Sequence, residues 1–395
     1  MDKLKLLSIR LRAVAVFRNL LDDSVINALS QLLSSLDSDI ETQVDMYGRF
    51  VYELYAHTDN LSKYILNIVT DDENVFIKKV ANSNIVSDEL TECVKAELAV
   101  FAEIAALTRE DFRGVIGFDG YLPVWNTTEI DFENEYFRRR DEIGRFGYGI
   151  YAKYYMFCVK DGAVVPVKHP DPVTLAELSG YQNERAAVIN NTKALLAGKP
   201  AANILLSGDA GTGKSSTIKA VVNEFKDEGL RIIEIRKDQL IDIPQIVDEL
   251  NSNPLKFILF IDDLSFNQTD DNFSALKAIL EGSVAAKSGN VVIYATSNRR
   301  HIVRESFKDR DASDDIHRND TVQELLSLSE RFGLTVYFSK PNKILYLDIV
   351  HQLAKRYSID MEQGELDVKA EAFALNKGNR SPRAAEQFIK SLITT

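Results

Sequence analysis

The stretch that decides the fold covers residues 208–215 and reads G-D-A-G-T-G-K-S. It follows a short apolar run at 204–206 and precedes a helix-like stretch that begins near Ser216. Its three glycines permit backbone torsions and a close approach that other residues resist, so successive N–H groups can point at phosphate oxygens. The N-terminus of the following helix adds positive potential. The sequence therefore predicts a phosphate-binding loop, a Walker A motif in its strand–loop–helix setting.

Within this loop each side chain has an expected task. Lys214 can reach the β and γ phosphates of a nucleotide, and the hydroxyl of Ser215 can ligate a bridging Mg²⁺. The alternative, a glycine-rich turn that matches by accident, is not favoured because both flanks also fit the motif. The residues expected to bind nucleotide here are Gly208, Asp209, Ala210, Gly211, Thr212, Gly213, Lys214, Ser215 and Ser216.

The composition narrows the class of protein. The 395 residues suffice for two or three domains, and 59 acidic against 47 basic residues give a formal charge of −12. This balance disfavours nucleic acid and anionic membranes as partners, and no apolar run approaches the roughly 18 residues of a membrane span. Cys93 and Cys158 form no C-x-x-C pair, so neither a disulfide framework nor a zinc site is indicated. We expect a cytoplasmic protein.

Changes in composition and residue spacing along the chain predict four regions. Residues 1–110 have helical spacing, and the basic stretch at 3–21, which superficially resembles a transit peptide, fits an ordinary packed helix better. Residues 111–170 are rich in glycine and aromatics, with a hairpin about Asp161 and Gly162, and read as a small mixed α/β segment and linker. Residues 171–340 are expected to form the nucleotide-binding core, and 341–395 a C-terminal helical subdomain.

The core alternates apolar strand-like runs with amphipathic helix-like ones. This alternation predicts an α/β fold, with a parallel sheet between helical layers. The expected strands lie at 204–206, 231–235, 257–261, 291–295 and 334–338, and the expected C-terminal helices at 342–357, 366–376 and 382–393.

Two carboxylates follow the apolar strand at 257–261, as in a Walker B motif. Asp262 is expected to hold the magnesium ion through its water shell, and Asp263 to orient or deprotonate the attacking water. Most proteins with this arrangement have glutamate at the second position. Because aspartate is one methylene shorter, slow hydrolysis is a specific expectation for this chain.

Asn298 follows the next strand and is the candidate sensor of the γ phosphate or of the nucleophilic water. The other interpretation is that it caps the following turn. The neighbouring Arg299 and Arg300 remain ambiguous between a solvated surface pair and contacts with a neighbouring subunit.

Two further arginines are candidate catalytic groups. Arg331 precedes the last core strand, where it can serve as an arginine finger in an adjacent protomer's site, or else form a surface ion pair with Glu330. Arg383 follows Pro382 in the first turn of a helix and can project onto bound phosphates. Arg380 is the weaker candidate for that task.

Together these motifs resemble the AAA+ class of P-loop ATPases over about residues 171–395. The runs at 178–181, 211–216, 261–266, 294–300 and 328–332 are similar to a bacterial AAA+ family known as domain of unknown function 815. The resemblance implies a three-layer αβα core and a sensor strand inserted between the Walker A and Walker B strands. It also implies that Tyr181 lies near the adenine and that an adjacent subunit completes the site, as in a homo-oligomer.

The leading prediction is an AAA+ ATPase that binds ATP and Mg²⁺ and hydrolyses the nucleotide to remodel an unidentified macromolecular target. Lys214, Asp263, Asn298, Arg331 and Arg383 would be its catalytic residues. One alternative is an ATP-binding switch or scaffold with little turnover, and another is a nucleic-acid-associated loader, which the acidic charge disfavours. A small-molecule kinase is the least expected class.

Overall fold

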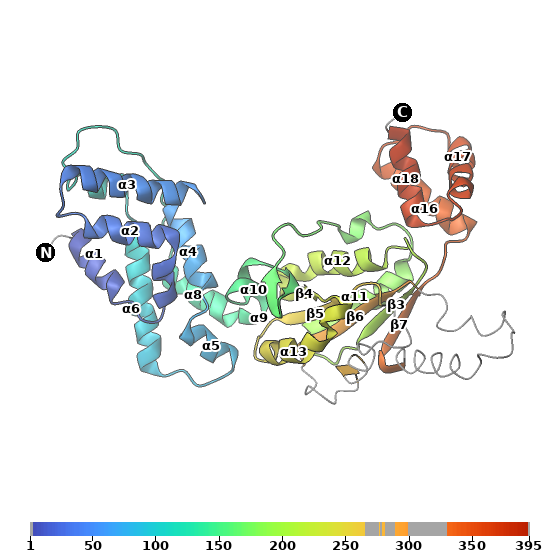
Figure 1. Ribbon diagram of the computed structural model, residues 1–395, viewed down its shortest axis with the longest axis horizontal. Helices are drawn as coiled ribbons and strands as arrows, with labels where there is room; N and C mark the ends of the chain where they lie inside the picture. Colours follow the sequence, from blue (N-terminus) through green and yellow to red (C-terminus); the bar gives the residue numbers. More distant parts are fainter. Residues whose placement is uncertain (1–2, 265–275, 277–278, 281–288, 299–329, 394–395) are drawn as a thin grey trace. The chain divides into compact units, whose positions relative to one another are not determined.

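A computed structural model describes residues 3–264, 276, 279–280, 289–298 and 330–393. The chain divides into two compact units, Met1–Lys153 and Tyr154–Thr395 (Figure 1). The sequence instead predicts a separate mixed segment at 111–170. The structure divides that stretch between the two units, because its first part packs on the helical core and its last part joins the sheet.

The first unit is helical throughout its regular structure. Several of its helices begin at a side chain that caps the first turn. For example, the Asp39 carboxylate accepts from the Thr42 N–H, and the Ser87 hydroxyl accepts from the Leu90 N–H. The helices are α1 (Lys3–Arg12), η1 (Arg18–Asp22), α2 (Ser24–Ser34), α3 (Ile40–Tyr55), α4 (Leu61–Asp71), α5 (Val75–Ala81), α6 (Asp88–Ala105), α7 (Arg109–Arg113), α8 (Phe132–Asp141), α9 (Ile143–Phe146) and α10 (Ile150–Lys153).

One apolar core holds this unit together. The first part of the basic N-terminal stretch is confirmed as a packed helix, since Leu4, Leu7 and Leu11 of α1 are buried. The core continues past residue 110: the ring of Trp125 is buried, and its indole N–H donates to the Leu107 carbonyl over 2.8 Å. Residues 111–153 therefore belong to the helical unit and not to a domain of their own.

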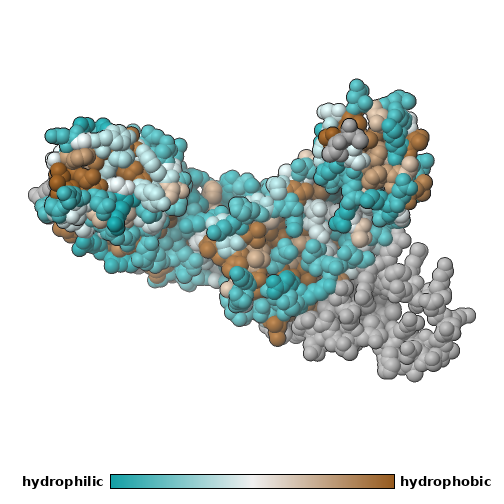
Figure 2. Space-filling model, turned by 45° about the horizontal axis from the view of Figure 1, so that its top comes forward, coloured by the Kyte–Doolittle hydropathy of each residue, from teal (hydrophilic) through white to brown (hydrophobic). Residues whose placement is uncertain are grey.

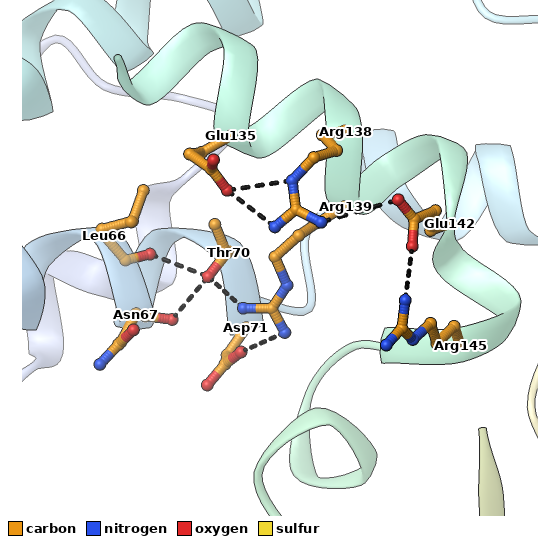
Figure 3. Close-up of polar contacts among 9 residues, drawn as sticks. All are labelled: Leu66, Asn67, Thr70, Asp71, Glu135, Arg138, Arg139, Glu142 and Arg145. Carbon is orange, nitrogen blue, oxygen red and sulfur yellow. Dashed lines mark hydrogen bonds and ion pairs between the residues drawn. The ribbon is translucent and has the colours of Figure 1, made fainter. Parts of the chain in front are cut away.

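Arg139 joins α8 to α4, next to a second arginine that pairs within its own helix (Figure 3). The Arg139 guanidinium donates to the Thr70 hydroxyl over 2.5 Å and pairs with the Asp71 carboxylate at 3.0 Å. Its neighbour Arg138 pairs with Glu135 at 2.8 Å. Arg140 pairs with Asp141 at 2.6 Å, so each of the three consecutive arginines has a carboxylate partner in the same unit.

The second unit is built on a sheet of seven strands in the part of the chain that the structure describes. The strand order is β2-β1-β4-β5-β6-β3-β7; β1 and β2 pair antiparallel, and all other neighbours are parallel. The strands are β1 (Met156–Lys160), β2 (Ala163–Pro166), β3 (Ile204–Gly208), β4 (Leu230–Glu234), β5 (Lys256–Ile261), β6 (Val291–Ser297) and β7 (Leu334–Phe338). All five predicted core strands and the Asp161–Gly162 hairpin are confirmed.

Helices cover the sheet on both faces, so its central strands are buried: every residue from Phe257 to Ile261 of β5 is 0% exposed. The helices of this unit, including the C-terminal helical subdomain α16–α18, are η2 (Leu175–Glu177), α11 (Gln182–Leu196), α12 (Lys214–Phe225), η3 (Lys226–Glu228), η4 (Lys237–Asp242), α13 (Ile243–Asn251), α16 (Lys343–Arg356), α17 (Gln363–Asn376) and α18 (Pro382–Ile393). The predicted αβα core and C-terminal helices are thus confirmed.

The order of the strands positions the site. Because β6 lies between β3 and β5, the carboxyl ends of these three parallel strands meet at one edge of the sheet. The phosphate loop follows β3, the two aspartates follow β5 and Asn298 follows β6. This arrangement confirms the expected insertion of the sensor strand.

The face that Figure 2 shows is mainly hydrophilic on both units, with apolar patches between the polar residues. In the first unit Tyr52 and Tyr121 are 73% and 80% exposed. No helix within the described ranges combines the length and apolar character that crossing a bilayer requires.

Candidate functional site

The phosphate loop turns sharply between the end of β3 and the start of α12 at Lys214. Gly208 has φ +143°, and a Cβ built on it would lie 2.0 Å from the carbonyl oxygen of Phe338 on the adjacent strand. No residue with a side chain fits there. Glycine at this position therefore allows the loop to leave the sheet beside β7.

Lys214 is buried beneath the loop, with 4% of its surface exposed. Its ammonium donates to the carbonyl oxygens of Gly208, over 3.0 Å, and Asp209, over 2.7 Å. Burial lowers the pKa of the Lys214 ammonium, and the charges of Asp209, Asp262 and Asp263 oppose that shift. The Lys214 ammonium is thus held at the loop, near these carboxylates, where it can bind phosphate oxygens.

A serine hydroxyl, a carboxylate and a threonine hydroxyl meet at the expected metal position. The Ser215 and Thr296 hydroxyls donate to the same oxygen of Asp262, over 2.7 and 2.6 Å. Ser215 and Asp262 supply hard oxygen atoms of the kind that Mg²⁺ takes from proteins. The described residues contain no cluster of three or more His, Cys, Asp or Glu side chains that could cage a metal. Two protein oxygens that leave room for phosphate and water fit magnesium.

Asp263 is held in a left-handed conformation, with φ +53°. Its N–H donates to the Thr296 hydroxyl over 2.9 Å, and one of its carboxylate oxygens accepts from the Asn298 side-chain amide, also over 2.9 Å. Such a conformation costs a non-glycine residue on the order of 1 kcal/mol. The hydrogen bonds offset that cost and fix the exposed carboxylate at the edge of the sheet.

A cavity of about 420 Å³ lies beside the loop and is lined by residues of the loop, of residues 171–181 and of the C-terminal helices. Tyr181 forms part of its wall: the ring packs on Phe338 with centroids 5.2 Å apart, and the hydroxyl donates to the Ser339 carbonyl over 2.6 Å. Burial raises the pKa of the Tyr181 hydroxyl. The cavity offers a flat purine an apolar wall next to the phosphate loop.

Arg383 lines the same cavity from the first turn of α18, which begins at Pro382 as expected. Its backbone N–H donates to the Gly211 carbonyl over 3.3 Å, so the helix start contacts the loop directly. Arg380, in contrast, forms two hydrogen bonds with Glu371, at 2.9 and 2.8 Å. Of these two arginines, Arg383 is the one beside the phosphate loop.

Arg331 lies at the other end of the sheet. It precedes β7 by three residues, whereas the opposite end of β7, at Phe338, contacts Gly208 of the loop. Arg331 lines a separate cavity of about 560 Å³ with Ala202 and Gly333. The fold therefore does not bring this arginine to the phosphate loop of its own chain. Arg299 and Arg300 lie outside the described residues.

Sequence reasoning missed three polar residues that the fold brings to this region. Thr296 orients both aspartates, although nothing in its sequence context distinguishes it from any threonine at a strand end. Arg356 of α16 donates to the carbonyls of Ala176 and Glu177, over 2.7 and 2.6 Å, and so ties the C-terminal helices to the cavity wall. Arg185 of α11 lines the cavity and is 7% exposed.

Comparisons with known proteins bear on the second unit. The family described as "Protein of unknown function (DUF815)" matches residues 151–395. The comparison with curated proteins found no match. Solved structures with a similar arrangement include the Thermotoga maritima RuvB Holliday junction branch migration motor and two of its variants, each at 16% identity. They cover 56% of this chain with TM-scores of 0.37 to 0.39, and this chain spans 65% of theirs, just under two thirds.

Proposed function

This chain belongs to the DUF815 family and has an AAA+ core, and from the geometry of its site we propose that it binds Mg²⁺–ATP and hydrolyses it. The carrying observation is the meeting of the Ser215, Asp262 and Thr296 side chains, with Asp263 and Asn298 beside them, at the mouth of the phosphate loop. Adenine nucleotide is the ligand that this loop and the adjoining cavity fit best.

In this proposal the phosphate loop and Lys214 bind the nucleotide. The loop N–H groups and the start of α12 surround the phosphates, and Lys214 exchanges the loop carbonyls for the β and γ oxygens. Ser215 and Asp262 would hold Mg²⁺, which when bound neutralises charge on the β and γ phosphates. Arg383, which is exposed beside the loop, adds a second positive charge.

In this proposal Asp263 and Asn298 promote the hydrolysis step. The Asp263 carboxylate would orient a water molecule in line with the γ phosphate and accept its proton. Asn298 restrains the carboxylate through one oxygen and leaves the other for the water. Because an aspartate reaches less far than a glutamate, we expect slow turnover.

Arg331 would complete the site of a neighbouring copy. Its place at the far end of the sheet supports a role between subunits, since it cannot serve its own phosphate loop. A homo-oligomer follows from this proposal. Mixing Arg331→Ala with Asp263→Asn protein tests it: recovery of hydrolysis in the mixture supports the role in trans, and a mixture as inactive as its components contradicts it.

The same observations carry a second candidate, a nucleotide-dependent switch or scaffold with little turnover. The hydrogen bond from Asn298 to Asp263 favours it, because the carboxylate is already occupied in part by an amide donor. The two candidates share the binding site and differ only in the rate of phosphate release.

A remodelling activity on a protein target in the cytoplasm is the biological role we propose for the hydrolysing form. Nucleic acid is a less favoured target. The net charge is −12, and Arg138, Arg139 and Arg140 of the helical unit are paired with Glu135, Asp71 and Asp141. Such paired charges have little capacity to release counterions from a phosphate backbone.

Titration calorimetry with ATP tests the proposed binding. We expect affinity that depends on magnesium, and its loss in Lys214→Ala. The matched control is Lys219→Ala, which removes a lysine from the same helix outside the loop and is expected to bind as the wild type does. Equal affinities for both variants, or no magnesium-dependent binding by the wild type, would contradict the proposal.

A further inference from the structure

The cavity beside the phosphate loop is lined by a largely buried arginine whose side chain has no partner in the described part of the chain. Arg185 lies in the second turn of α11, lines the cavity and is 7% exposed. No hydrogen bond or ion pair joins its side chain to any described residue. Arg231, buried to a similar degree, donates instead to the carbonyls of Lys226 and Leu230. A buried charge of this kind is costly unless a ligand satisfies it.

Arg185 lies one helical turn after Tyr181, on the same wall of the cavity. Its backbone N–H donates to the Tyr181 carbonyl over 3.0 Å, and both residues line the cavity. Burial lowers the pKa of the Arg185 guanidinium.

The cavity wall combines polar side chains with apolar ones, among them Tyr181, which packs on Phe338, and Ile349 from α16. Apolar and aromatic faces with a few placed polar groups are typical of a site for a flat heterocycle.

We propose that Arg185 is the base-recognising residue of the nucleotide site, donating to a ring nitrogen of adenine. The proposal rests on the proposed ATP binding and extends it to the specificity of the site. A guanidinium only donates hydrogen bonds, and the ring nitrogens of adenine only accept them. The competing interpretation is that Arg185 contacts the phosphates, and tripolyphosphate, which has no base, distinguishes the two.

Titration calorimetry of the full chain with Mg²⁺, using ATP and inorganic tripolyphosphate as separate ligands, tests this role. Since a hydrogen bond to a charged group contributes about 1.5 to 3 kcal/mol, Arg185→Met should weaken ATP binding roughly 10- to 100-fold. Its affinity for tripolyphosphate should stay at the wild-type value. Arg185→Lys, which keeps the charge with fewer donors, should fall between the wild type and Arg185→Met for ATP.

The unfolding temperature of Arg185→Met without nucleotide is the control for folding. Because Arg185→Met removes an unpaired buried charge, its unfolding temperature without nucleotide should equal or exceed that of the wild type. A lower value would mean that the arginine stabilises the fold and would overturn the proposal.

Deaza analogues identify the acceptor. One of 1-deaza-, 3-deaza- and 7-deaza-ATP should bind the wild type more weakly than ATP does, and Arg185→Met should bind that analogue and ATP equally. Equal weakening of ATP and tripolyphosphate, no weakening of either, or no sensitive analogue would each overturn the role of Arg185. If the wild type binds neither ATP nor tripolyphosphate, the proposed function itself fails instead.

Discussion

The side-chain amide of Asn298 donates a hydrogen bond to the carboxylate of Asp263 over 2.9 Å. The two residues follow neighbouring strands, β6 and β5, so the register of the sheet brings them together. Both side chains are exposed at the mouth of the phosphate loop. The amide thus sets the direction of the carboxylate proposed to activate water.

Asn298→Ala should therefore impair hydrolysis more than binding. Loss of a single preorganised donor at a reacting centre costs roughly 10²- to 10³-fold in kcat, and we expect a loss in that range. ATP affinity measured by calorimetry should change little, because Lys214 and the loop remain. An Asn298→Ala protein with wild-type phosphate release would show that the amide does not position Asp263.

Thr296 holds both aspartates, and its replacement should disturb the metal site. Thr296→Val keeps the shape of the buried side chain but removes the hydroxyl that joins the Asp262 carboxylate to the Asp263 N–H. We expect a higher magnesium concentration for half-maximal nucleotide binding, by roughly tenfold for the loss of about 1 to 1.5 kcal/mol. Thr296→Ser keeps the hydroxyl and is the control. If the valine and serine variants have the same magnesium dependence, the hydroxyl has no such role.

Gly208→Ala should destabilise the second unit through the backbone. Its new methyl group would meet the Phe338 carbonyl oxygen at 2.0 Å, in addition to the strain of φ +143°. We expect a loss above about 3 kcal/mol, which lowers the unfolding temperature by more than about 6 °C. Gly198→Ala is the control, since Gly198 also has positive φ, +67°, but open space around its Cβ. Similar unfolding temperatures for the two variants would contradict the proposed clash.

The helical unit should show a pH-dependent stability that depends on Asp72. Burial raises the pKa of this carboxyl from 3.8 to about 6. The folded state then holds the proton more tightly than the unfolded state, so the contribution of Asp72 to stability falls as pH rises from about 4 to 6. Asp72→Asn should stabilise the protein by up to about 2 kcal/mol at pH 7.5 and by little at pH 3.5. Urea unfolding at both values measures this difference, and an equal effect at the two pH values would contradict it.

Local sequence patterns predict much of this fold. Buried parallel strands read as apolar runs, so the five core strands could be predicted, as could Asp262 and Asp263 after the third of them. The position of the hairpin at the edge of the sheet could not be predicted. Its residues specify two paired strands, but their addition to the edge of the sheet depends on the pairing of β1 with β4, about 75 residues later in the sequence.

The site divides in the same way. Lys214, Ser215 and Asp263 belong to motifs with fixed spacing, whereas Thr296 and Arg185 acquire their roles only from the fold. Arg185 illustrates the reason most clearly. An arginine on a helix usually faces water, and only the packing of α11 beside the cavity buries this one at 7% exposure.

Steady-state release of phosphate from Mg²⁺–ATP by the full chain is the most direct test of the central claim. The account predicts slow release that rises more than in proportion to protein concentration, and that is lost in both Lys214→Ala and Asp263→Asn. Release that persists unchanged in Asp263→Asn would contradict the role assigned to that carboxylate. Complete absence of release by a wild-type protein that binds ATP would contradict hydrolysis and favour the nucleotide-dependent switch.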